Sequence, residues 1–253
     1  MKNEKDFGAK PIVVLLNWTP QPEKLVKLIW DVMVKDIQAD AKQFGEDFWK
    51  KYLLGEVDPV NSEEQEILDV VKKEVLGNAF EFIQLNWFLG NVSRAFTHQI
   101  VRNRVGFSYS QQGMRVVTKE DFANRKMFHQ PPNCKNPEAF YEAMKKIDSI
   151  YQENLHSGEH PEVARGLLPT NITTDIMVGA NYRAWRQMVV KRSCVRVQGE
   201  FRQIVDLMID EVERKMGPWW ADIKPICETD GKCMVPSQWC GREKTEDGRQ
   251  IIH

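Results

Sequence analysis

The chain has 253 residues, and its 35 basic and 36 acidic residues leave a formal net charge of -1 at pH 7. A hydrophobic content of 42% and a charged content of 28% are ordinary for a globular protein, and the length suits one large domain. No apolar run approaches the roughly 20 residues that span a bilayer, and the acidic first residues lack a signal-peptide cleavage site, which disfavours membrane-spanning and secreted proteins.

Hydrophobic spacing predicts strands and helices in the N-terminal third of the chain. Residues 11–18 form a β-branched and apolar run, which predicts a buried strand. Residues 23–37 and 62–75 repeat apolar side chains at the helical period. Residues 81–89 are apolar enough for a second strand, and the Gly-Asn pair at 90–91 should end it.

Residues 93–117 carry five basic side chains and no acid, although the chain as a whole is nearly neutral. Such a concentration indicates an anionic ligand, because the folded state would otherwise hold uncompensated repulsion. Arg94, His98 and Arg102 are spaced four apart, so a helix here would place them on one face. Residues 106–113 then predict a loop that can donate hydrogen bonds to a phosphate or a base edge. For Arg94, pairing with an acid distant in sequence is the alternative.

The C-terminal half is predicted to be mainly helical. Residues 119–137 are rich in Pro, Asn and Lys and predict a surface excursion. Helical periodicity returns in residues 138–155, in the short segment 162–168, and in two long segments, 170–191 and 197–216.

A second acid-free stretch lies between Asp175 and Glu200. Its basic residues are Arg183, Arg186, Lys191, Arg192 and Arg196. Two such stretches in a neutral chain favour convergence on a phosphate-bearing ligand, with Arg165 just upstream as a further cation. A solvated helix face is the alternative for three of them, Arg186, Lys191 and Arg196.

The tail has no hydrophobic period, so we divide the chain into a principal domain, 1–216, and a Trp- and Cys-containing C-terminal extension, 217–253. Five cysteines without a secretory signal are typical of reduced thiols, and we expect a cytoplasmic protein. Cys227, Cys233 and Cys240 are spaced too irregularly for the paired cysteines of a zinc ribbon, and the five histidines are scattered. We therefore expect no metal site.

Four ordered blocks of sequence resemble one family. Residues 92–116, VSRAFTHQIVRNRVGFSYSQQGMRV, resemble the signature of flavin-dependent thymidylate synthases, which is Arg-His-Arg, then Ser, then Glu-Ser-x-Arg-Tyr. VVLLNWTPQPEKLV looks like the family's first strand and helix, and its second half is matched in order by ARGLLPTNITTD, NYRAW and KRSCVRVQGEFR. The resemblance covers residues 11–205.

This resemblance implies an α+β fold, with a central sheet and several long helices, that assembles into a homotetramer with active sites shared between subunits. It implies FAD as the cofactor, with NADPH and methylenetetrahydrofolate as co-substrates. The expected reaction transfers a one-carbon unit to the pyrimidine ring of dUMP and gives dTMP, without attack by an enzyme cysteine.

The resemblance also assigns roles to individual residues of this chain. Those that would hold the flavin are Asn78, Glu81, Arg102, Asn103, Arg104, Asn181, Arg183 and Gln187. Those that would hold the nucleotide, with its phosphate on Arg165, are Gln99, Arg102, Gln111, Gln112, Gly113, Arg115 and Arg165. Arg192 would be the catalytic residue, lying against the pyrimidine and stabilising negative charge as the ring is activated.

The chain departs from the signature at four positions, and the spacing from Arg102 to Arg115 is one residue longer. Asn103 replaces the motif His, and three further replacements are Gln112 for Glu, Gly113 for Ser and Val116 for Tyr. A Gln both donates and accepts where an ionised Glu only accepts, so base preference could differ. The alternatives are a pyrimidine-nucleotide hydroxymethylase acting on dUMP or dCMP, and a non-catalytic nucleotide binder. A pI near 6.5 argues against a nucleic-acid partner, and no membrane partner is expected.

Overall fold

The computed structural model describes residues 7–34, 42–43, 45–47, 59–73, 77–132, 134–229, 231, 233, 236–238 and 240. Its centre is a four-stranded antiparallel sheet with the order β1-β2-β4-β3. The strands are β1 (Ile12–Trp18), β2 (Gln84–Ser93), β3 (Phe107–Gln111) and β4 (Thr173–Asn181). The expected α+β class, a central sheet with several long helices, is confirmed.

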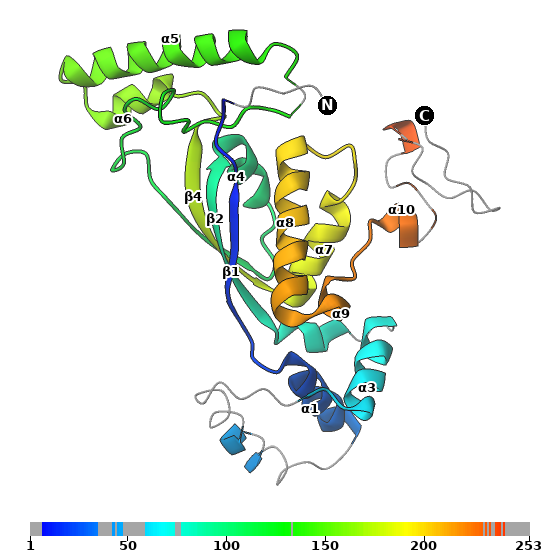
Figure 1. Cartoon of the computed structure of the whole chain (residues 1–253). Helices are drawn as coiled ribbons and strands as arrows, with labels where there is room; N and C mark the ends of the chain where they lie inside the picture. The colour runs from blue at the N-terminus through cyan, green and yellow to red at the C-terminus, as the bar shows by residue number, and fades with distance from the viewer. Residues whose placement is uncertain are drawn as a thin grey trace.

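Helices cover one face of the sheet and both of its ends (Figure 1). The covering helices are α4 (Arg94–Ile100), α7 (Tyr182–Arg192) and α8 (Gly199–Met216). At one end lie α5 (Pro137–His156), α6 (Pro161–Ala164) and the 3-10 turn η2 (Arg165–Leu167). At the other end are α1 (Pro22–Val34), α3 (Ser62–Lys73) and the 3-10 turn η1 (Gly77–Glu81). The tail forms α9 (Pro218–Ala221), α10 (Ile226–Thr229) and η3 (Pro236–Gln238).

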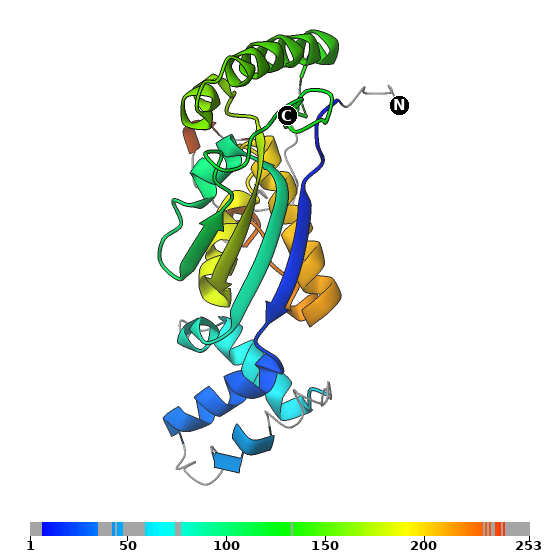
Figure 2. The same ribbon diagram turned by 90° about the vertical axis from the view of Figure 1, so that its left-hand side faces the viewer.

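The opposite face of the sheet is not covered by any described helix, as Figure 2 shows from that side. Among the described helices, none is long and apolar enough to cross a membrane. The predicted helices at 23–37 and 62–75 are confirmed as far as Val34 and Lys73, and their remaining residues lie outside the described ranges.

The main core lies between the sheet and its covering helices, because strand side chains alternate between the two faces. Leu85, Trp87 and Leu89 of β2 are fully buried, and Trp87 stacks on Trp185 of α7 with ring centroids 5.9 Å apart. The tail contributes Trp220, whose backbone carbonyl accepts from the Tyr182 hydroxyl at 2.7 Å. The division of the chain at residue 216 stays a prediction.

The predicted surface excursion at 119–137 instead builds a second hydrophobic core beneath α5. Phe122 and Phe128 are fully buried there, with Tyr151 of α5 and Ile172. The Ala123 N–H donates to the Asp148 carboxylate at 2.9 Å. Polar composition indicated a solvated loop, but the few apolar side chains in the segment are the ones that fold inward.

Two sequence predictions about secondary structure are wrong. The long helix expected at 170–191 is helical only from Tyr182, and its first half is β4. This segment is rich in Thr, Ile and Val and pairs with strands on both sides, so sheet pairing outweighs helical periodicity. The loop expected at 106–113 contains β3, which forms the edge of the sheet beside β4.

The strand expected at 81–89 is also shifted. It begins at Gln84 and continues through the Gly-Asn pair to Ser93. The register with β4 shifts between Leu89 and Val92, and Asn91 has a φ of 56°, so the pair forms an irregularity within the strand instead of ending it.

Glu211 of α8 joins that helix to β1. Its carboxylate accepts from the backbone N–H of Leu15 at 3.1 Å, and Arg214 Nη2 lies 2.6 Å away. Burial raises the pKa of Glu211, but the hydrogen bonds from Arg214 and from Leu15 outweigh it. The folded-state pKa therefore lies below its ordinary value.

We expect Glu211 to stabilise the fold above its unfolded-state pKa and to lose this contribution as the pH falls through the lower folded-state pKa. Urea unfolding near neutral pH and at about pH 3 measures the loss. The Glu211→Gln variant should lose less stability on acidification than the wild type, while the exposed neighbour variant Glu213→Gln should match the wild type. An unchanged acid response in Glu211→Gln would contradict this assignment.

Candidate active site

The first acid-free stretch begins at the junction of β2 and α4. The Ser93 hydroxyl accepts from the Phe96 N–H at 3.0 Å and caps the helix. The helix ends at Ile100, so Arg94 and His98 lie on it but Arg102 lies beyond its end. The predicted stacking of three basic side chains on one helix face is therefore wrong for Arg102.

Three segments that carry predicted flavin residues meet where β4 becomes α7. The Asn181 side chain caps α7 by accepting from the Ala184 N–H at 2.8 Å, and the Asn181 N–H donates to the Gly106 carbonyl at 3.0 Å. Gly106 has a φ of +73°, and a Cβ there would stand 2.6 Å from Asn181 Nδ2, so only glycine fits. Arg183 Nη1 lies 2.5 Å from Glu81 Oε1, which joins α7 to η1.

The remaining predicted flavin residues lie around this junction. Asn78 is exposed on η1, Arg104 is exposed in the loop before Gly106, and Gln187 is exposed one turn after Arg183 on α7. The structure thus brings together side chains from η1, the loop after α4 and the start of α7.

Asn103, which replaces the motif His, is used by the protein itself. Its Nδ2 donates to the Ile100 carbonyl at 2.8 Å, and its own carbonyl accepts from the Tyr109 hydroxyl at 2.8 Å. The same hydroxyl lies 2.7 Å from the Ile100 carbonyl, so its single hydrogen is shared between the two carbonyls, and burial raises the pKa of Tyr109 well above its ordinary value. The Asn103 amide therefore fixes the loop that carries Arg102 and Arg104.

Arg192, Arg102 and Gln99 gather near the first turn of α8. The Arg192 guanidinium lies over the Phe201 ring, 4.6 Å from its centroid. Burial and then the nearby charge of Arg102 lower the pKa of Arg192. The Gln99 side chain donates to the Gln198 side chain just before α8. The half-buried side chains of Arg192 and Gln99 and the exposed Arg102 thus lie around the start of α8.

Arg115 and Arg165 both form ion pairs with Glu162 of α6. Glu162 Oε2 lies 3.0 Å from Arg115 Nη2, and Glu162 Oε1 lies 3.5 Å from Arg165 Nη2. These side chains are well exposed, so the ion pairs are weak and an anionic ligand can compete for both arginines.

Arg94 adds a cation to this end of the sheet. Burial and then the charge of Arg165 lower the pKa of Arg94, and no described residue forms an ion pair with it. Among the described residues, pairing with a distant acid is therefore observed for Arg115 and Arg183, and Arg165 pairs with an acid three residues before it, but no such ion pair is formed by Arg94.

The side chains of Gln111 and Gln112 form hydrogen bonds with different partners. Gln111 Nε2 donates to Thr97 Oγ1 of α4 at 3.0 Å, whereas Gln112 Oε1 accepts from Lys119 Nζ at 2.7 Å. Lys119 is 3% exposed, and burial lowers its pKa. Gly113 has open space where a Cβ would stand, so packing does not explain why the motif Ser is missing.

Lys119, Gln198 and Glu200 were not identified as site residues from the sequence. The first lay in a segment predicted to be a surface excursion. The other two lie inside the matched block KRSCVRVQGEFR, which was the one available signal. Their contacts reach residues distant in sequence, and sequence spacing does not reveal such contacts.

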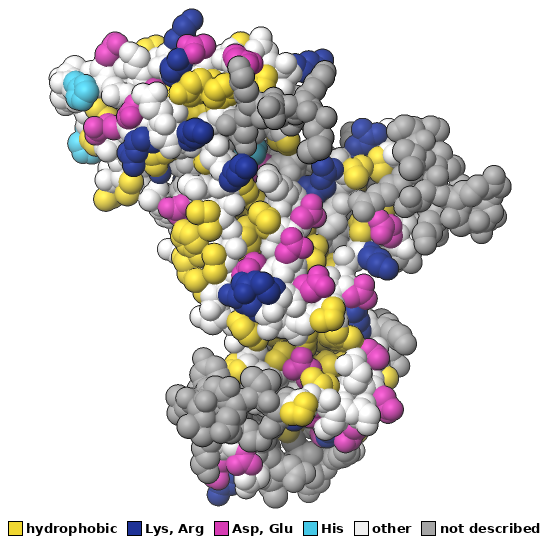
Figure 3. Space-filling model, in the orientation of Figure 1, with side chains coloured by type: hydrophobic (Ala, Val, Ile, Leu, Met, Phe, Trp, Pro, Cys, Tyr) yellow, Lys and Arg dark blue, Asp and Glu magenta, His cyan; other side chains and the backbone are white. Residues whose placement is uncertain are grey.

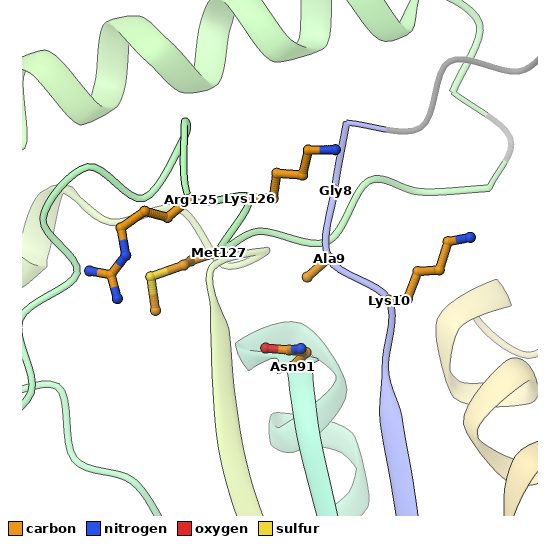
Figure 4. Close-up of a pocket in the computed structure, with 7 residues that line it drawn as sticks. All are labelled: Gly8, Ala9, Lys10, Asn91, Arg125, Lys126 and Met127. Atoms are coloured by element: carbon orange, nitrogen blue, oxygen red, sulfur yellow. The ribbon is translucent and has the colours of Figure 1, made fainter.

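A pocket of about 460 Å³ lies elsewhere, where the chain enters β1 (Figure 4). Its cationic lining residues are Lys10, Arg125 and Lys126, with Asn91 at its floor. Figure 4 shows the side chains of Arg125 and Lys126 extending in opposite directions, so the cations do not converge on one point. None of the predicted site residues lines this pocket.

All five cysteines are free thiols. Within the described ranges, no group of three or more His, Cys, Asp or Glu side chains could hold a metal ion.

Comparisons with known proteins match most of the chain. A family model described as thymidylate synthase complementing protein matches residues 14–217. The flavin-dependent thymidylate synthase of Pyrococcus furiosus is 27% identical over 234 residues, covering 87% of this chain and 88% of the relative. That of Thermococcus onnurineus is 28% identical over 246 residues, covering 90% of this chain and 92% of the relative.

Two solved structures share the fold. Thymidylate Synthase X from Helicobacter pylori, with FAD and dUMP, has a TM-score of 0.64 at 14% identity and covers 84% of this chain and 98% of its own. The UMP/dUMP methylase PolB from Streptomyces cacaoi, bound with 5-Br dUMP, has a TM-score of 0.63 at 14% identity and covers 85% of this chain and 94% of its own. Because the family model spans residues 14–217, the chain belongs to the thymidylate synthase complementing protein family, the flavin-dependent thymidylate synthases.

Proposed function

We propose that this protein is a flavin-dependent thymidylate synthase that transfers a one-carbon unit from methylenetetrahydrofolate to the pyrimidine ring of dUMP and gives dTMP. The observation that carries the proposal is the family match over residues 14–217. The relatives named above are flavin-dependent thymidylate synthases that align over most of their own length. FAD is the expected cofactor, and NADPH is the expected reductant.

The residues present at the junction of β4 and α7 fit a flavin nucleotide. Arg102 and Arg104 are exposed and have no acidic partner among the described residues, which suits a diphosphate. Asn78, Glu81 and Asn181 supply acceptors and donors beside them. The residues proposed to hold the flavin are Asn78, Glu81, Arg102, Arg104, Asn181, Arg183 and Gln187. Asn103 is proposed to fix the loop that carries Arg102 and Arg104. When bound, the flavin supplies the hydride that completes the methyl group.

The nucleotide is proposed to lie between the side chains around Arg115 and Arg165 and the side chains around Arg192. Arg115 and Arg165 would hold its phosphate once Glu162 releases them. Gln99, Arg102, Gln111, Gln112 and Gly113 would surround the sugar and base. Arg192 packs on Phe201 and is proposed to lie against the pyrimidine. There its charge would stabilise negative charge that develops on the ring.

The mass of the nucleotide product tests the reaction. Purified protein is incubated without oxygen with FAD, NADPH, methylenetetrahydrofolate and a mixture of dUMP, UMP and dCMP. We expect a methyl group on dUMP. A hydroxymethyl product, or a gain on another nucleotide, would contradict thymidylate formation. No gain on any nucleotide, with the flavin bound, would support the non-catalytic binder.

The uncovered face of the sheet supports a homotetramer with shared sites. Val14, Phe88 and Met177 are neighbours across β1, β2 and β4 on this face, and Leu16 is 48% exposed beside them. Figure 3 shows hydrophobic side chains gathered over the strands. A contiguous apolar surface of this kind is typical of a subunit interface.

A charge placed on this face should break the assembly. In Met177→Arg, a guanidinium would be buried against apolar side chains of a second copy, which is strongly unfavourable. Light scattering should give about four times 29.5 kDa for the wild type and a smaller mass for the variant, with turnover reduced at least about tenfold. Val32→Arg, at an exposed position of α1, is the matched control. A tetrameric Met177→Arg protein would exclude this face as the interface.

A further inference from the structure

The first turn of the C-terminal extension, α9, is held by hydrogen bonds from three other helices. It lies just beyond the segment that the family model matches. Trp219 Nε1 donates to Asp69 of α3 at 2.8 Å, and Trp220 Nε1 donates to Glu23 of α1 at 2.6 Å. The Trp220 carbonyl accepts from the Tyr182 hydroxyl of α7. Because hydrogen bonds are directional, both indole rings are fixed in orientation, at the end of the sheet that carries α1 and α3 (Figure 1).

The local sequence explains how the chain turns from α8 into α9. Gly217 ends α8 with a φ of 101°, a backbone conformation that residues with a side chain rarely adopt. Pro218 then begins α9, at the position where a helix tolerates proline best. This turn places the Trp220 ring against the Tyr182 ring, edge to face, with centroids 4.9 Å apart. The Gly-Pro pair thus brings the extension back to the start of α7.

The turn η1 has an exposed side and a buried side. Asn78 and Glu81, two of the residues proposed to hold the flavin, are exposed, whereas Ala79 and Phe80 between them are 3% and 2% exposed. The ion pair of Glu81 with Arg183 is itself exposed and contributes little. A short 3-10 helix has poor hydrogen-bond geometry, so the position of η1 depends mainly on the packing of Phe80.

Phe80 packs against the aromatic rings of α7 and α9. Its ring centroid lies 5.3 Å from that of Tyr182, in the edge-on arrangement that aromatic rings prefer. The Trp220 and Trp219 rings lie 6.1 and 6.3 Å from Phe80. Of these three rings, one belongs to the helix that carries proposed flavin residues and two belong to the extension. The extension therefore forms much of the surface on which η1 rests.

We propose that Trp219 and Trp220 are positioning residues for the flavin, which they influence through Phe80. This proposal rests on the proposed function and gives the extension a role in it. The proposed flavin residues of η1 and of α7 belong to two separate elements, and the aromatic rings fix the distance between these elements. A ligand that is held by both binds tightly only when that distance is set beforehand, since otherwise binding must include the cost of ordering η1.

The test is the FAD dissociation constant, measured by quenching of flavin fluorescence under conditions where urea unfolding shows every variant to be folded. In Trp219→Leu the constant should rise about tenfold, the effect of losing the equivalent of one hydrogen bond to the ligand. Trp219→Phe keeps a ring against Phe80 and should stay within about twofold of the wild type. Phe122→Leu removes a fully buried ring from the second core beneath α5 and is the matched control. It should lower stability and leave FAD binding unchanged.

A double-variant cycle checks that the effect passes through Phe80. Phe80→Leu alone should also weaken FAD binding about tenfold. Phe80→Leu combined with Trp219→Leu should weaken it little more than either change alone, because residues in contact that act on the same group are not additive. Fully additive losses would overturn positioning through Phe80.

The outcomes separate the positioning role from the proposed function. An unchanged FAD dissociation constant in Trp219→Leu would overturn the positioning role, while the proposed function would stand. An equal rise in Phe122→Leu would also overturn it, because the weaker binding would then follow from lower stability alone. A wild-type protein that binds no FAD would contradict the proposed function and the positioning role together.

Discussion

The Arg192→Met variant should lose turnover by a factor of about 10² to 10³ while it keeps its fold. Removing one preorganised group that stabilises developing charge typically costs this much in kcat. Methionine preserves the apolar contact with Phe201, so the loss reports the missing charge. Arg192 is half-buried, which lowers its pKa, so its charge is screened by water less than that of an exposed arginine.

The measurement is single-turnover formation of the methylated nucleotide, with dUMP binding measured separately. Lys191→Met removes an adjacent, exposed cation of the same helix and should change turnover by less than about twofold. A variant at Arg192 that keeps more than about a tenth of wild-type turnover would remove this residue from the catalytic role.

The Trp185→Ala variant should destabilise the protein by about 3–5 kcal/mol, the cost of emptying a large aromatic site in a core. Trp185 is fully buried, stacks on Trp87 of β2 and lies 5.6 Å from the Tyr182 ring. It therefore ties the helix that carries Arg183 and Arg192 to the central strands. We expect weaker flavin binding as a consequence of the looser attachment of α7.

Trp185→Phe is the informative control for that loss. Trp185 Nε1 is buried without a described hydrogen-bond partner, so phenylalanine removes an unsatisfied donor as well as packing area. The loss in Trp185→Phe should be less than half of that in Trp185→Ala, measured by urea unfolding. Equal losses in both variants would mean that the indole N–H has a partner in the folded protein.

The local sequence pattern was sufficient to predict a feature wherever one continuous stretch of the chain determines that feature. The period of apolar residues located α5 and α8, and the acid-free stretches marked the arginines that the structure gathers into cationic groups. The four matched blocks indicated the family and the α+β fold. Pattern failed at β4, because a strand flanked by two others is stabilised by pairing that its own residues do not encode. It failed again at 119–128, where a few aromatic side chains outweigh a polar composition.

The amino-acid sequence by itself determined the family, the positive charge of the site and most of the residues proposed to hold its ligands. Tertiary structure alone decided how those residues are held. Glu200 reaches Ser93 across 107 positions, and Arg183 reaches Glu81 across 102. Hydrogen bonding is short-ranged and directional, so which arginine is paired, and which way round an amide lies, depends on atoms that only folding brings together.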